Sequence, residues 1–90
     1  MEKKRSPADT YVRRVSRLLG MIYFREWKLE NITSLPDNQV RYLKGEISAL
    51  RWAVIIVSEG KEDWHDTACN VADRRWEKTL LHLEEKHGLR

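Results

Sequence analysis

Apolar residues recur at alternating intervals of three and four residues through most of this chain, and that spacing limits the fold more than any other feature. Because an α-helix turns once about every 3.6 residues, side chains at this spacing lie on one face. No segment alternates apolar and polar residues in the way of a half-buried strand. The spacing therefore predicts an all-α protein with three long helices.

Two short breaks separate the three helical segments. Ser6 followed by Pro7 is typical of a helix start, because the hydroxyl caps the first turn and proline needs no backbone partner there. Pro36 disfavours helix in the residue before it, and Gly60 readily takes the left-handed conformation that ends a helix. We expect the helices to span about 7–30, 36–59 and 62–87.

A chain of 90 residues has room for a single domain, here expected over residues 1–90. Long helices that are joined by short loops lie antiparallel to their neighbours in the sequence. Two architectures satisfy these conditions. One is an antiparallel three-helix bundle, and the other is a helical hairpin with the third helix packed across it.

The second helix carries apolar residues around most of its circumference. Its main strip runs from Val40 to Val57, and only a narrow line of residues is polar. Because such a helix is normally buried on two sides, we expect it to be the central helix. A second apolar strip flanks the first and comprises Tyr42, Gly45, Ala49, Trp52, Ala53 and Ile56.

This second strip contains two small residues, Gly45 and Ala49, one turn apart, which let another backbone approach closely. That backbone belongs either to another helix of the chain or to a second copy of the chain. An internal contact is slightly favoured, and a homodimer is the alternative. In the homodimer, the residues that meet the second copy are Tyr42, Gly45, Ala49, Trp52 and Ile56.

Positive charge is concentrated at one end of the chain. The first thirty residues carry eight basic and four acidic groups, whereas the whole chain has a formal net charge of +3. On the first helix the basic residues fall on one side, with large apolar residues on or beside that side and away from the core strip. This basic–aromatic face, the expected partner-binding site, comprises Arg14, Arg17, Met21, Phe24, Arg25, Trp27 and Lys28.

The combination of arginine with exposed aromatic rings is typical of protein–protein hot spots, in which Trp and Arg are enriched. It is also typical of nucleic-acid binding, in which guanidinium groups contact phosphates and rings stack on bases. A third interpretation is a solvated face whose rings pack on another helix. A partner protein with an acidic surface is the leading hypothesis for a binding role, and nucleic acid is the alternative.

The third helix carries an acidic row opposite its apolar strip. This row has two interpretations: it pairs with the basic residues of the first helix, within one chain or between two, or it keeps the surface solvated. Its members are Asp66, Asn70, Asp73, Glu77 and Glu84.

Candidate catalytic and metal-ligating residues do not form a known pattern. His65, Cys69 and Asp73 follow one another at four-residue intervals and climb about 12 Å along a straight helix, too far for one tetrahedral zinc ion. Cys69 lacks a nearby third group that would orient a base beside it, and the chain has no glycine-rich phosphate loop. We therefore predict a protein that is not an enzyme, with no catalytic residue, metal or cofactor.

Features of targeting are also absent from the sequence. No apolar run approaches the roughly 20 residues that cross a bilayer. The basic start Met1–Arg5 leads into Ser6 and Pro7 rather than into an apolar stretch, so no secretory signal is indicated. A lone cysteine cannot form an internal disulfide. These features favour a cytoplasmic protein without a membrane partner.

One segment of the second helix resembles a known group of proteins. The run Tyr42–Arg51, YLKGEISALR, is similar to a helix in small helical proteins of bacteriophages and prophages. The resemblance implies an accessory protein that binds host or viral macromolecules, and it implies no catalytic residue. The function expected first is a non-enzymatic adaptor or inhibitor that uses the basic–aromatic face. A nucleic-acid-binding protein and a homo-oligomeric structural component are the alternatives.

Overall fold

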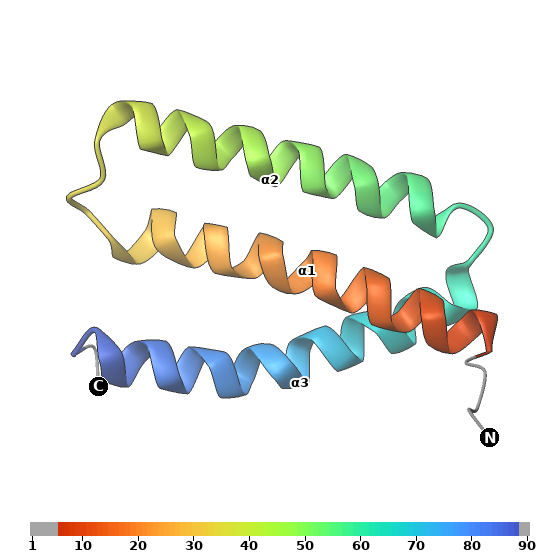
Figure 1. Ribbon diagram of the computed structural model, residues 1–90. Helices are drawn as coiled ribbons and strands as arrows, with labels where there is room; N and C mark the ends of the chain where they lie inside the picture. The colour runs from red at the N-terminus through yellow and green to blue at the C-terminus, as the bar shows by residue number, and fades with distance from the viewer. Residues whose placement is uncertain (1–5, 89–90) are drawn as a thin grey trace, which may run out of the picture.

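The computed structural model describes residues 6–88, and these residues form three helices that lie side by side (Figure 1). α1 spans Pro7–Asn31, α2 spans Asp37–Ser58 and α3 spans Glu62–Lys86. Each helix begins and ends within one residue of its expected position, and no strand occurs between residues 6 and 88. The prediction of an all-α protein with three long helices is confirmed. The ends of the expected 1–90 domain, including the basic start Met1–Arg5, lie outside the described residues.

Local signals set the ends of the helices. The Ser6 hydroxyl accepts a hydrogen bond from the Asp9 amide at 3.1 Å, and Pro7 occupies the first turn, as the sequence predicts. Gly60 has a φ of +71°, the left-handed conformation, between α2 and α3. A β-carbon is strained in that conformation, so glycine suits this turn better than any other residue.

α1 lies between the other two helices (Figure 1). Both α2 and α3 pack along it, whereas α2 and α3 barely contact each other. Helices that follow one another in the chain are antiparallel, so α3 runs parallel to α1 (Figure 1). The arrangement is therefore a three-helix bundle whose central element is α1.

The buried core is centred on α1 rather than on α2, so the expectation that the second helix is central is wrong. The main cluster of buried side chains comprises Tyr11, Val15 and Ile22 of α1, Ile47 and Val54 of α2, and Ala68 of α3. α1 contributes half of this cluster because it packs on a neighbour at each side. α2 has one neighbour, so only Leu43, Ile47 and Val54 of its main apolar strip are buried.

Two ion pairs join α1 to α2. Arg25 contacts Glu46 at 3.0 Å, and Glu26 contacts Arg51 at 3.2 Å. Both ion pairs keep part of their side chains in contact with solvent and contribute little free energy, so their main effect is on the alignment of the two antiparallel helices.

Hydrogen bonds join all three helices at the end of the bundle where α2 turns into α3. The Tyr11 hydroxyl of α1 donates to the Ser58 hydroxyl of α2 at 2.8 Å. The same Tyr11 hydroxyl lies 3.2 Å from the Nδ1 atom of His65 on α3. The Tyr11 ring also packs on Trp64, with a centroid distance of 5.8 Å. This cluster aligns the start of α3 with the start of α1.

Ile22→Ala should lower the free energy of unfolding by about 2–5 kcal/mol, because it opens a cavity at a buried position of the central helix. Leu81→Ala is the matched control, since Leu81 is an exposed residue of α3. That control should cost about 1 kcal/mol or less. Urea unfolding followed by circular dichroism measures both values, and similar losses in the two variants would contradict the central position of α1.

Candidate interaction surfaces

The basic–aromatic face expected on the first helix is only partly exposed. Arg14 and Arg17 are exposed, and Met21 is 38% exposed. The other four members, Phe24, Arg25, Trp27 and Lys28, are half-buried or buried. The seven residues therefore do not form one continuous free surface.

Trp27 is buried, with 6% of its surface exposed, so the expectation that it lies outside the core is wrong. Its indole packs against the imidazole of His87, with a centroid distance of 5.1 Å. Because α1 is central, it buries a second face toward α3, and Trp27 borders the groove between these two helices. Helical spacing gives the angle of Trp27 relative to the core strip, but it does not reveal that a second face is covered.

Phe24 is half-buried, and its ring contacts two neighbours on its own helix. Its ring stacks on Trp27 at a centroid distance of 6.5 Å and an interplanar angle of 14°. The Nζ atom of Lys28 lies 4.5 Å from the centroid of the Phe24 ring, within cation–π range. Phe24, expected together with Trp27 to be an apolar anchor for a partner, therefore already contacts Lys28 of its own helix.

Arg25 is engaged by α2. Its guanidinium donates to the Glu46 carboxylate and to the Met21 carbonyl, each at 3.0 Å. This ion pair leads from the first helix to the second rather than to the acidic row of the third helix. The prediction that Arg25 contacts a partner thus applies to a side chain that already has an acidic neighbour.

An open groove lies between the first half of α1 and the end of α2, and we call it the basic groove. Its volume is about 530 Å³, and it is lined by Thr10, Arg13, Arg14, Arg17, Leu18 and Val57. The three arginines are exposed, as is Val57. Sequence patterns place Arg14 and Arg17 on one side of the helix. They miss Val57, which reaches this groove only because α2 packs on α1.

The apolar residues expected to form an oligomer contact are all exposed, and we call them the α2 outer strip: Tyr42, Gly45, Ala49, Trp52 and Ile56. Tyr42 is 71% exposed, Trp52 is 64% exposed and Ile56 is 63% exposed. No helix among the described residues covers this strip. The favoured internal contact is therefore wrong, and the alternative, a contact outside the chain, stays a prediction.

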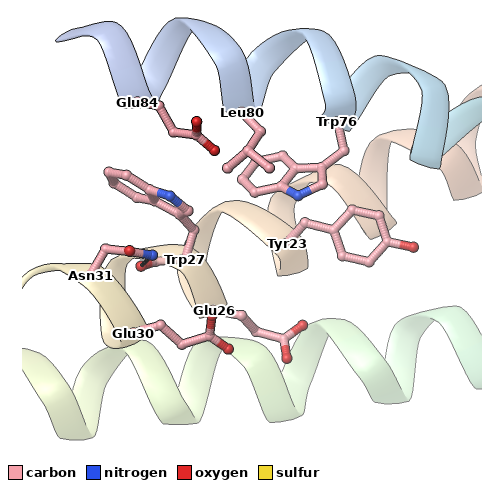
Figure 2. Close-up of a pocket in the computed structure, with 8 residues that line it drawn as sticks. All are labelled: Tyr23, Glu26, Trp27, Glu30, Asn31, Trp76, Leu80 and Glu84. Atoms are coloured by element: carbon pink, nitrogen blue, oxygen red, sulfur yellow. Dashed lines mark hydrogen bonds between the residues drawn. The ribbon is translucent and has the colours of Figure 1, made fainter. Parts of the chain in front are cut away.

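Another groove, of about 620 Å³, lies between α1 and α3 (Figure 2). Its lining consists of Tyr23, Glu26, Trp27, Glu30, Asn31, Trp76, Leu80 and Glu84. Figure 2 shows Trp27, Trp76 and Leu80 between the two helices, with the Glu26 and Glu30 carboxylates on the side of α2. Glu26 is bound to Arg51, and the Tyr23 hydroxyl donates to Asp73. Aromatic rings beside carboxylates suit a cationic group, but several of these polar atoms already have partners.

A polar cluster lies where α2 turns into α3. The Nδ1 atom of His65 is 3.2 Å from the hydroxyls of Tyr11 and Ser58, and its Nε2 atom is 3.5 Å from the Cys69 sulfur. Burial raises the pKa of the Cys69 thiol, and two aspartates of α3 raise it further. The thiol is therefore protonated at neutral pH, a state that disfavours nucleophilic attack. Within residues 6–88, no group of three or more His, Cys, Asp and Glu side chains is arranged to hold a metal ion.

Comparison of the chain with protein-family models, with curated proteins and with solved structures found no match. In the described part of the chain, no helix is long and apolar enough to cross a bilayer. The exposed surfaces themselves are therefore the basis for a proposal about function.

Trp27→Ala should lower the free energy of unfolding by about 3–5 kcal/mol, because it removes a buried indole between α1 and the end of α3. Met21→Ala, on the exposed side of the same helix, is the control and should cost far less. Thermal and urea unfolding measure the effect. An unchanged melting temperature for Trp27→Ala would instead support the hypothesis that Trp27 lies outside the core and contacts a partner.

Tyr23 gives the stability a pH dependence at alkaline pH. Burial, followed by the hydrogen bond that it donates to Asp73 at 2.9 Å, raises the pKa of Tyr23 from 10.0 to about 12. The folded state holds the Tyr23 proton more tightly than the unfolded chain does. The contribution of protonated Tyr23 to the free energy of unfolding is therefore complete below pH 10.0 and is lost as the pH rises to about 12. Tyr23→Phe should flatten the loss of stability in this window, and urea unfolding at several alkaline pH values tests it. An equally steep loss in Tyr23→Phe would exclude Tyr23 as the cause.

Proposed function

We propose that the protein is a non-enzymatic interaction protein, an adaptor or inhibitor, that binds an acidic segment of a partner protein in the basic groove. The observation that carries the proposal is the presence of three exposed arginines, Arg13, Arg14 and Arg17, around an apolar lining. This proposal keeps two arginines of the expected basic–aromatic face, and it replaces the aromatic anchors with Leu18 and Val57.

The arginines have no acidic partner among the described residues. The ion pairs between residues 6 and 88 are Arg25–Glu46 and Arg51–Glu26, and neither involves the groove. Three guanidinium groups within two helical turns repel one another, so a carboxylate placed among them is stabilised. The groove therefore favours an acidic ligand.

The apolar lining of the groove sets a second requirement for the ligand. Leu18 is half-buried, and Val57 is an exposed apolar residue at the end of α2. A ligand that covers them gains from apolar burial, which a carboxylate alone does not provide. The groove is open rather than enclosed and lies across two helices, a shape that suits a short peptide segment. A peptide with acidic residues beside an aliphatic or aromatic residue meets both requirements.

Nucleic acid is the alternative ligand for the same arginines. Binding of single strands relies on aromatic rings that are free to stack on bases. On α1, Trp27 is buried, and the Phe24 ring is already in contact with Trp27 and Lys28. The loss of these platforms favours the protein partner. The resemblance of the run Tyr42–Arg51 to phage and prophage proteins supports the same class of function, a viral accessory protein.

Selection from a displayed library of random peptides tests the proposal while the partner is still unidentified. The wild-type protein should enrich peptides that combine Asp or Glu with a large apolar residue. The triple variant Arg13→Glu, Arg14→Glu and Arg17→Glu should bind the selected peptides at least about tenfold more weakly, because it reverses the charge of the groove. The matched control makes the same change in charge on α3, at Arg74, Lys78 and Lys86, and should bind like the wild type.

Two results would overturn the proposal. One is the absence of any enriched acidic peptide. The other is binding of a DNA duplex or of single-stranded RNA whose affinity falls steeply with salt and is lost in the same triple variant, because that result assigns the arginines to phosphate contacts.

A further inference from the structure

The α2 outer strip has the residue spacing of a coiled-coil seam. Tyr42, Gly45, Ala49, Trp52 and Ile56 follow one another at steps of three, four, three and four. These steps repeat every seven residues, which is the spacing that brings two helices together along one seam. The strip lies on the side of α2 away from the buried residues Leu43, Ile47 and Val54, which pack toward α1. α2 thus carries one apolar seam for its own chain and a second seam that residues 6–88 leave uncovered.

The exposed area of the strip reaches the minimum that a specific contact between two copies needs. Tyr42, Trp52 and Ile56 each expose more than 60% of their surface, and Ile55 beside them is 53% exposed. With the small residues and the flanking stems included, the strip presents about 500 Å² per chain. Two copies would bury about 1,000 Å² in total, near the lower limit for a specific interface. An apolar patch of this size matches the largest patch of a typical monomer, which is often a site of interaction.

Gly45 contributes nothing to the packing of its own chain. A β-carbon at this position would meet no atom within 4 Å beyond its chain neighbours and the adjacent backbone of α2. A glycine in the middle of a helix costs about 1 kcal/mol relative to alanine. Gly45 lines a shallow hollow of about 550 Å³ together with Tyr42 and Ala49. A bulky side chain from outside the chain fits such a hollow, and the large side chain at the matching position of the strip is Trp52.

We propose that the protein forms an antiparallel homodimer in which the outer strips of two α2 helices pack against each other. With Ala49 on the two-fold axis, Tyr42 lies opposite Ile56 of the second copy, and Gly45 lies opposite the position next to Trp52 of the second copy. Each indole then enters the hollow at Gly45, twice by symmetry. A parallel pair would instead place Trp52 against Trp52 and leave the two hollows facing each other.

Charge at the ends of the strip supports the antiparallel direction. Arg41 lies on α2 eight residues before Ala49, and Glu59 caps the end of α2 ten residues after it. Both are exposed, and neither takes part in the ion pairs of residues 6–88. The antiparallel dimer brings Arg41 of each copy near Glu59 of the other. A parallel dimer would keep Arg41 of one copy at the opposite end of the contact from Glu59 of the other, so the two charges could not pair.

The dimer uses a surface separate from most of the basic groove, so it stands apart from the proposed function. Val57 of the groove lies on the flank of α2, off the outer strip, and the three arginines of the groove are on α1. A dimer that binds no acidic peptide, or a monomer that binds one, would therefore distinguish the two proposals.

Sedimentation velocity and light scattering on the full chain test the dimer. The wild type should have twice the chain mass of 10.8 kDa at concentrations above about 0.1 mM. Ala49→Glu should be a monomer with unchanged helical circular dichroism, because it places two carboxylates together on the two-fold axis. Asn70→Glu on α3, which adds the same charge at an exposed site, is the control and should remain a dimer.

Gly45→Leu separates association from folding. Within the chain the new side chain meets open space and improves helix propensity, so the melting temperature of the dilute protein should not fall. In the dimer it fills the hollow, so the dissociation constant should rise at least about tenfold. This variant keeps the test valid if Ala49→Glu fails to fold.

A charge exchange tests the direction of the helices. Arg41→Glu alone should weaken the dimer, and Arg41→Glu combined with Glu59→Arg should restore it, because the two charges are exchanged across the contact. A wild-type protein that stays monomeric at about 1 mM would overturn the proposal. Unchanged dimerisation in Ala49→Glu would overturn the interface, and a double variant that stays weakened would overturn the antiparallel direction.

Discussion

Burial of apolar side chains on two faces of α1 is the constraint from which the rest of the arrangement follows. Val15 and Ile22 lie in the main cluster with residues of both neighbouring helices, and Trp27 closes the far end of the contact with α3. Because α1 occupies the middle, α2 and α3 each have one neighbour and one outward face. The positions of the exposed surfaces are consequences of this order of helices.

The outward faces differ in chemistry, and the differences decide what each can bind. The basic groove combines arginines that have no acidic partner within residues 6–88 with a small apolar lining, which suits an acidic segment. The α2 outer strip is almost uncharged along its centre and has opposite charges near its two ends, which suits a copy of itself in the reverse direction. The groove of Figure 2 is acidic and aromatic, but its carboxylates and phenol are partly bound within the chain. A non-enzymatic binding role agrees with surfaces that are open and shallow.

The polar residues that most resemble a catalytic set have structural partners instead. The Tyr11 and Ser58 hydroxyls are hydrogen-bonded to each other, and His65 lies beside both, where the three helices meet. Cys69 is next to the same imidazole, yet its raised pKa keeps the thiol protonated. The hydrogen bonds of this cluster connect the end of α2 to the starts of α1 and α3. They fix the relative positions of the three helices more specifically than hydrophobic packing alone would.

The positions of the helices were predictable because their signals are local. The Ser6 cap, the break at Pro36 and the left-handed Gly60 each act on the backbone within a few residues, whatever the rest of the chain does. The apolar strips of α2 could also be recognised, since helical spacing fixes which side chains share a face. The partner of each strip was not predictable, because periodicity contains no information on which helix lies against which face. Only the packing of α2 and α3 around α1 enclosed Trp27, exposed Trp52 and brought Val57 beside the arginines.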